Sequence, residues 1–169
     1  MTMRAAGTCW IVLLAVGCSD GMEPALPANG VFTGKLTGAR TFDLTGSASA
    51  GIVYIETGSE YVVRMFDPVG DEVRGVIIGC QGDGIPELGP HALGPGADCH
   101  ARYARFAQSP SPGSTVAESA EAVSGTVTVT RAVDEEFAGR FTFQGELLTE
   151  TDTVGPLAAS GTFRAVRYP

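Results

Sequence analysis

The sequence contains two histidines, His91 and His100, and both lie in or beside a Gly- and Pro-rich segment bounded by two cysteines. Glu87 and Asp98 belong to the same segment. Imidazole, carboxylate and thiolate groups are the usual ligands of zinc and related ions. An envelope hydrolase or a metal-dependent enzyme that uses His91, His100 and carboxylates is therefore the catalytic alternative for this chain.

Two features oppose a metal centre in this segment. Asp98, Cys99 and His100 are adjacent, and neighbouring side chains of an extended chain point to opposite faces, so they cannot converge on one ion. The other two cysteines of the chain lie near its N-terminus, which leaves Cys80 and Cys99 to pair as a disulfide in an oxidising compartment. We expect no metal, no cofactor and no catalytic residue, and we treat the segment as a candidate binding loop on a rigid scaffold.

Other chemistries find little support. The segment Gly46-Ser47-Ala48-Ser49-Ala50-Gly51 does not satisfy the Gly-x-Ser-x-Gly pattern of a nucleophilic serine. The single lysine, Lys35, lies in a predicted strand, and no Gly-rich phosphate loop accompanies it. With 19 acidic against 11 basic residues the net charge is −8, and an acidic surface repels nucleic acid.

Short segments with apolar residues at every second position run through the chain, separated by Gly, Pro, Asp and Ser. The clearest is Phe137 to Leu147, whose odd positions are apolar or Gly and whose even positions are mostly polar. This period is typical of strands with one buried face. We predict an all-β domain at 31–169, an antiparallel β-sandwich or barrel of about 8–10 strands, and leave the choice between the two open.

Four local patterns refine this picture. Asp67-Pro68-Val69-Gly70 matches a type I turn and predicts a hairpin. Thr115-Val116-Ala117-Glu118 matches a capping box, and a short helix is predicted from there to Ser124. Asp134-Glu135-Glu136 is interpreted as a solvated hairpin tip, and the glycines inside the strands, Gly34, Gly46, Gly139 and Gly145, indicate bulges or bends.

The N-terminus has the three parts of a secretory signal: a basic start at Arg4, an apolar run to Val16, and Gly17-Cys18. The run is far shorter than the ~20 residues that a membrane-spanning helix needs. We expect residues 1–17 to be a signal peptide and 18–30 to be a flexible tether, about 35 Å long if extended.

Leu14-Ala15-Val16-Gly17-Cys18 resembles the lipobox of bacterial lipoproteins, although Ala15 stands where that motif prefers Leu. Ser124 to Val129, Phe137 to Phe143 and Ser160 to Phe163 resemble the C-terminal hairpin and last strand of a diffuse group of uncharacterised bacterial lipoproteins. The resemblance implies acylation of Cys18, export to the cell envelope and attachment to a membrane through the lipid, and it implies no functional residues. An ordinary secretory signal cut nearby is the alternative.

From these observations we expect a secreted, lipid-anchored protein of the cell envelope that is a binding domain rather than an enzyme. Its partner is a protein or a small ligand. A cavity enclosed by the sheet would favour a small apolar ligand, and a solid core would favour a protein partner.

Overall fold

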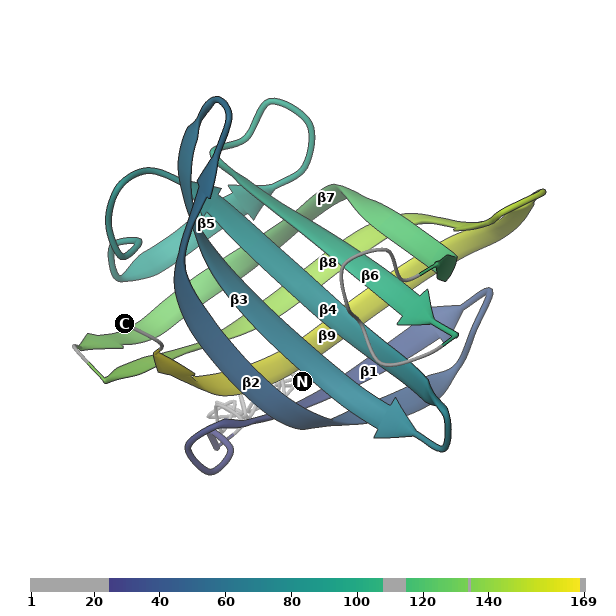
Figure 1. Ribbon diagram of the computed structural model, residues 1–169, viewed down its shortest axis with the longest axis horizontal. Coiled ribbons are helices and arrows are strands. Elements are labelled where there is room, and N and C mark those ends of the chain that lie inside the picture. Colours follow the sequence, from purple (N-terminus) through teal and green to yellow (C-terminus); the bar gives the residue numbers. More distant parts are fainter. Residues whose placement is uncertain (1–24, 108–114, 134, 168–169) are drawn as a thin grey trace, which may run out of the picture.

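The computed structural model describes residues 25–107, 115–133 and 135–167, and within them nine strands form one sheet that closes into a barrel (Figure 1). The strands are β1 (Val31–Gly38), β2 (Phe42–Ile55), β3 (Gly58–Val69), β4 (Glu72–Gln81), β5 (Gly89–Leu93), β6 (Cys99–Phe106), β7 (Val116–Val133), β8 (Glu136–Thr149) and β9 (Thr153–Arg167). The all-β prediction is confirmed. Of the two architectures left open, the barrel is the one observed.

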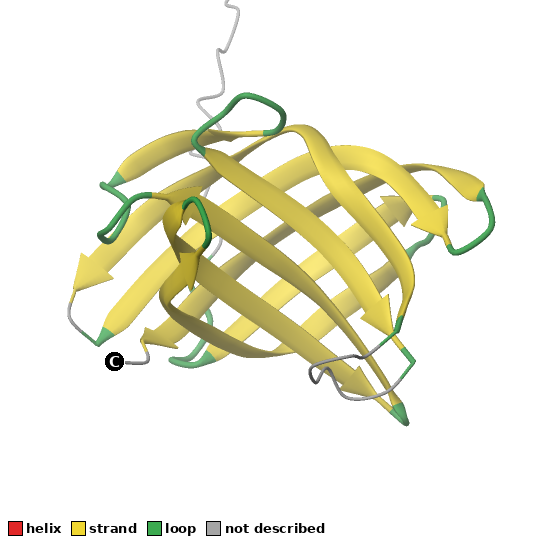
Figure 2. Ribbon diagram, turned by 45° about the horizontal axis from the view of Figure 1, so that its top comes forward, coloured by secondary structure: helices red, strands yellow, loops and turns green. Residues whose placement is uncertain are grey.

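The order of strands around the barrel follows the chain except at β5. The order is β1-β2-β3-β4-β6-β5-β7-β8-β9, and β9 closes the barrel by pairing antiparallel with β1. Figure 2 shows the strands curving around the interior. β5 is short and lies between one half of β6 and β7, while the other half of β6 pairs with β7 directly. Most pairs are antiparallel, and β2–β9 and β5–β6 are short parallel contacts.

The interior of the barrel is filled with side chains from alternate positions of every long strand. On β8 these are Phe137, Phe141, Phe143 and Leu147, all buried as the alternation predicts. The ring of Phe137 lies 4.8 Å from that of Tyr61 and 5.8 Å from that of Phe163, measured between centroids. The core thus contains aromatic rings from neighbouring strands, β8 and β9, and from β3 across the barrel.

Glycines make room for these rings at one crossing point. Gly34 of β1 and Gly161 of β9 are directly paired, and a Cβ at Gly161 would lie only 2.8 Å from Cζ of Phe141. Irregularities also occur near two of the predicted bends. Gly139 pairs with Val129 and Gly145 with Ala122, and the register of β7 shifts directly after each of these two partners. Glycine therefore serves close packing here as well as curvature.

The predicted helix after Thr115 is wrong. β7 occupies this segment, and Glu118, Ala120 and Ala122 alternate into the barrel. Alanine is favoured in helices, yet here Ala120 pairs with Tyr103 of β6, and its small side chain leaves room for that ring. Packing across the barrel outweighs the local preference.

The hairpin between β3 and β4 is confirmed, but its turn lies later than predicted. Val69 pairs with Glu72, so the two central residues are Gly70 and Asp71. Gly70 has φ of +61°, which matches the glycine-first turn that suits a twisted hairpin. Asp67 is instead part of β3 and is buried.

Antiparallel pairing places the connections at two opposite ends of the barrel. The β1–β2, β3–β4 and β8–β9 turns lie at the end we call the charged end, on the right of Figure 1. Residues 25–30 and the β2–β3, β4–β5, β5–β6 and β7–β8 connections lie at the other, which we call the tether end. No helix long and apolar enough to cross a membrane occurs in the described parts of the chain.

Candidate functional site

A row of charged side chains closes the interior at the charged end. Cross-strand pairing aligns Asp67 of β3 with Arg74 of β4, Arg74 with Arg105 of β6, and Arg105 with Glu118 of β7. These four positions are in register with the inward-facing core residues of their strands. The row therefore lies where the apolar packing ends.

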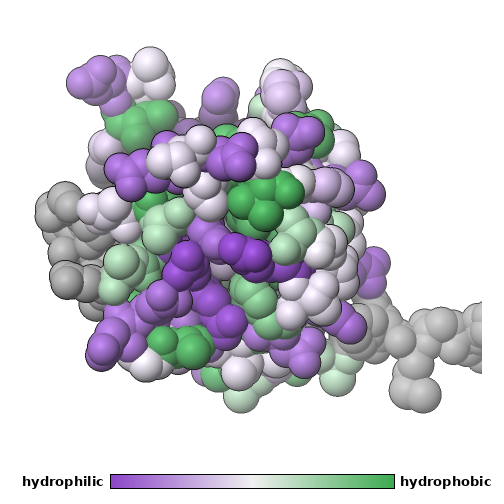
Figure 3. All heavy atoms as spheres, turned by 90° about the vertical axis from the view of Figure 1, so that its right-hand side faces the viewer, coloured by the Kyte–Doolittle hydropathy of each residue, from purple (hydrophilic) through white to green (hydrophobic). Residues whose placement is uncertain are grey.

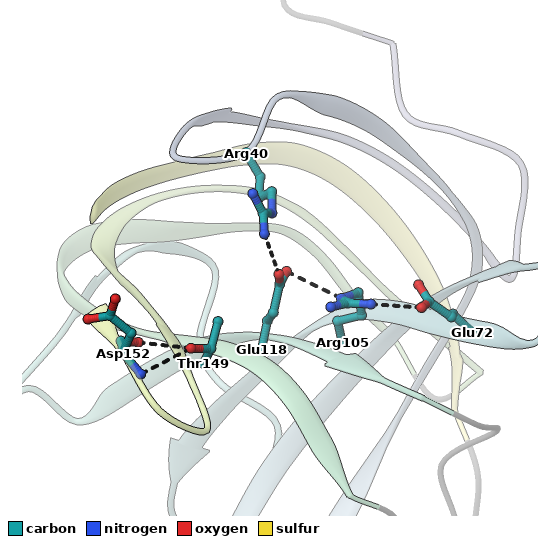
Figure 4. Close-up of polar contacts among 6 residues, drawn as sticks. All are labelled: Arg40, Glu72, Arg105, Glu118, Thr149 and Asp152. Carbon is teal, nitrogen blue, oxygen red and sulfur yellow. Dashed lines mark hydrogen bonds and ion pairs between the residues drawn. The ribbon is translucent and has the colours of Figure 1, made fainter. Parts of the chain in front are cut away.

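Glu118 is the most buried acid of this row, with 3% of its surface exposed. Arg40, from the β1–β2 turn, donates a hydrogen bond from Nη2 to Glu118 Oε1 at 2.7 Å (Figure 4). Nε of Arg105 lies 3.3 Å from Glu118 Oε2, and Nη1 of Arg105 donates to Glu72 Oε1 at 2.7 Å. A single carboxylate thus joins two arginines from distant parts of the chain.

The second half of the row is held by another ion pair. Arg74 donates from Nη2 to Asp67 Oδ2 at 2.7 Å, and its guanidinium lies 4.2 Å from the centre of the Phe42 ring. This arrangement combines a charge-assisted hydrogen bond with a cation–π contact. Space-filling representation of this end shows hydrophilic residues gathered at its centre, with separate apolar side chains around them (Figure 3).

The electrostatics of Glu118 reflect opposing effects. Burial alone would raise its pKa, but the hydrogen bonds and charges of Arg40 and Arg105 together outweigh burial and hold the pKa below its usual range. The carboxyl group is therefore ionised at neutral pH. It acts as the fixed anion of the charged end rather than as a proton donor.

Tyr103 lies one layer deeper than the charged row. Its side chain is fully buried, and its hydroxyl has no hydrogen-bond partner among the described residues. Burial, and then the negative charge of Glu118, raises the pKa of Tyr103 to about 12, against the lowering effect of the neighbouring arginines. The phenol thus remains neutral and does not serve as a base.

The predicted binding loop lies at the opposite, tether end. Cys80 and Cys99 form the predicted disulfide, and they are a direct cross-strand pair between β4 and β6. The chain between them makes the β4–β5 connection, β5 and the β5–β6 connection. The disulfide therefore links the two ends of this loop at the rim of the barrel.

The four polar residues predicted for this loop do not form one cluster. His91 donates from Nε2 to the carbonyl oxygen of Glu87 at 2.8 Å. His100 lies on the outer wall, with Nε2 3.9 Å from Glu60 Oε2, and Asp98 is exposed near the end of the loop. Within the described residues no group of three His, Cys, Asp or Glu side chains is placed to hold a metal ion.

The predicted acidic hairpin tip is partly wrong. Asp134 lies outside the described residues and Glu135 is exposed, but Glu136 is buried. Glu136 accepts a hydrogen bond from Arg164 at 2.9 Å and lies 3.1 Å from Nε of Arg131. The hydrogen bond from Arg164 lowers the pKa of Glu136.

Sequence reasoning missed the whole charged row. A signal was present, because Arg74 is separated by one residue from Val76 and Arg105 by one from Tyr103, which places both arginines on the inward face of their strands. An arginine at an inward position is a reason to look for a buried acid. The partner acids could not be found without knowing which strands are neighbours.

The fold and these contacts define a closed β-barrel with a packed interior and an ion-paired end. A scan against protein-family models, a search of curated proteins and a search of solved structures found no match to this chain. The likeness to bacterial lipoproteins remains a prediction that depends on the residues given for it, and Cys18 lies outside the described residues.

Proposed function

We propose that this protein is a lipid-anchored, non-catalytic binding domain of the bacterial cell envelope, and that its partner is another protein. The single observation that carries the choice of partner is the packed interior. Within the described residues, the enclosed space between Tyr61, Val63, Ile78, Val129 and Phe137 leaves no room even for a water-sized molecule. We therefore place the binding of the partner on the outer surface of the barrel.

The charged end is the surface that best fits such a partner. Arginine is enriched at protein interfaces, and Arg40 keeps 43% of its side chain exposed while Glu118 holds it in place. Val69, Leu148 and Val154 are exposed at the strand ends around this centre. Ion pairs that fix the side chains before binding reduce the entropy lost on association.

Photo-crosslinking in the producing cell tests the proposal. A photoreactive amino acid replaces Val154 at the charged end, Leu88 on the disulfide-bounded loop, or Val123 on the wall, all of which are exposed. We expect one discrete protein adduct from position 154 and none from position 123. An adduct from position 88 alone would make the predicted loop the binding surface and contradict our choice.

A pair of charge reversals makes the test specific. Arg40→Glu should abolish the adduct from position 154, because it removes the exposed cation of the charged end. Arg64→Glu is the matched control, since Arg64 is an exposed arginine of β3 on the outer wall. Equal adduct yields in the two variants would refute a role for the charged end.

The anchor is tested separately by mass spectrometry of the N-terminal peptide. We expect an acylated Cys18 as the first residue, and loss of membrane association in Cys18→Ser. A peptide that begins elsewhere and carries no acyl group would indicate the ordinary secretory signal instead.

A further inference from the structure

Exposed apolar side chains are concentrated at the tether end. Of the eleven large hydrophobic residues exposed in the described parts of the chain, seven lie there. They lie among residues 25–30, near the strand ends beside the β2–β3 and β7–β8 connections, in the β4–β5 connection and near the end of β9: Leu26, Ile52, Tyr54, Ile55, Leu88, Val133 and Val166. We call this set the apolar rim.

Two parts of the apolar rim protrude most. Tyr54 is 84% exposed on the β2–β3 hairpin, with Ile52 and Ile55 beside it on the same strand. Leu88 is 66% exposed on the disulfide-bounded loop. Figure 1 shows both connections extending from the left-hand end of the barrel. No other described part of the chain covers the side chains of Tyr54 and Leu88.

The position at which the chain enters the barrel indicates what the apolar rim contacts. The described chain begins at Ala25 beside the tether end, and Gly30 fixes it there by donating to the Arg164 carbonyl oxygen at 2.7 Å and accepting from the Ala48 amide at 2.8 Å. Cys18 precedes Ala25 by seven residues. Seven residues span at most about 25 Å.

That reach is shorter than the barrel. Strand β8 has 14 residues, which measure about 45 Å along the strand and about 35 Å along the barrel axis at the usual tilt. A lipid on Cys18 therefore enters the bilayer near the tether end and cannot reach past the charged end. Exposed apolar residues and the anchor lie on the same side of the molecule.

We propose that the apolar rim rests on the bilayer surface, with Tyr54 and Leu88 at the level of the lipid headgroups. This inference depends on the lipid anchor of the proposed function. Tyrosine suits that depth because its ring is apolar and its hydroxyl remains wet. The exposed carboxylates of Glu56, Glu87 and Asp98 keep the contact shallow. The charged end then points away from the membrane.

Depth-dependent quenching of fluorescence tests this orientation. The only tryptophan of the sequence, Trp10, is removed with the signal peptide when Cys18 becomes the first residue, so Tyr54→Trp and Val154→Trp each report one end of the barrel. The purified, acylated protein is reconstituted in phosphatidylcholine vesicles with brominated acyl chains. We expect quenching several-fold stronger for Tyr54→Trp, and the same for Leu88→Trp, than for Val154→Trp.

The outcomes separate this inference from the proposed function. Acylated protein that stays on the vesicles with equal quenching at the two ends, or with stronger quenching at position 154, would overturn the orientation and leave the anchor intact. A chain without an acyl group on Cys18 that does not sediment with the vesicles would overturn both.

Discussion

Phe163→Ala tests how tightly the barrel interior is packed. Phe163 has no exposed surface, its ring lies 5.8 Å from that of Phe137, and a Cβ placed at Gly139 would lie 3.0 Å from its Cζ. Removing a ring enclosed in this way loses its transfer free energy and leaves a cavity, which costs about 3–5 kcal/mol. The same loss lowers the melting temperature by roughly 10 °C in a domain of this size.

Urea denaturation followed by circular dichroism measures the change in the free energy of unfolding. Tyr54→Ala is the matched control, because it removes an aromatic ring that is 84% exposed and should change stability by no more than about 0.5 kcal/mol. A loss below about 1 kcal/mol for Phe163→Ala would refute the packed interior, because it would mean that the neighbouring rings already have space to move.

The cavity itself provides a second measurement. A dry apolar cavity of this kind binds benzene, and a ligand that binds the folded state raises its stability. Benzene should therefore restore part of the stability of Phe163→Ala and leave that of the parent unchanged.

Three further changes have expected outcomes. Glu118→Gln should lower the free energy of unfolding at neutral pH by about 2 kcal/mol, through the loss of charge-assisted hydrogen bonds. Because the pKa of Glu118 is lowered in the folded state, its ionised carboxylate stabilises the fold fully above the ordinary carboxyl pKa, and this contribution disappears as the pH falls through the folded-state pKa. The difference in the free energy of unfolding between parent and Glu118→Gln should therefore shrink in acid. An equal difference in urea denaturations at pH 7 and pH 3 would contradict this. Tyr103→Phe removes a buried hydroxyl that has no hydrogen-bond partner among the described residues and should leave stability unchanged or raise it by about 1 kcal/mol. Because burial and then the charge of Glu118 raise the pKa of Tyr103 to about 12, the variant should also lose one tyrosine's share of the phenolate absorbance that develops at the highest pH; a large loss of stability would show that the hydroxyl is hydrogen-bonded. Replacing Cys80 and Cys99 together by serine should cost roughly 3 kcal/mol for a loop of this length, and equal denaturation midpoints with and without the disulfide would argue against it.

The strands with one clean period were predictable from the sequence. Phe137, Phe141, Phe143 and Leu147 face the interior of β8 because their spacing puts them on one side of an extended chain, whatever the neighbours are. The disulfide was predictable too, because only Cys80 and Cys99 remained to pair. These features depend on residue type and local spacing alone.

The charged end depends on pairings far apart in the sequence. Arg40 and Glu118 meet only because β1, β2 and β7 lie around one closed sheet, and no local pattern encodes that contact. β4 is also apolar on both faces, with Val73 and Ile77 on one side and Val76 on the other, so its inward face was ambiguous. β5 was missed because Gly89 and Pro90 look like a loop.

The composition of the two ends explains how one small domain could serve two contacts. The tether end offers a group of apolar side chains beside its projecting connections, which suits a soft lipid surface. The charged end offers side chains held by mutual ion pairs, which suits a protein surface of fixed shape. The packed interior keeps these ends at a constant separation.

The most direct test of the central claim is whether the folded parent protein takes up an apolar ligand. Benzene and a long-chain fatty acid are titrated into isotope-labelled protein, and the signals of interior side chains such as Phe137 and Tyr61 are followed by nuclear magnetic resonance. We predict no shift of these signals at any ligand concentration that leaves the protein folded. Saturable binding of one ligand per barrel, with shifts confined to the interior, would contradict the account.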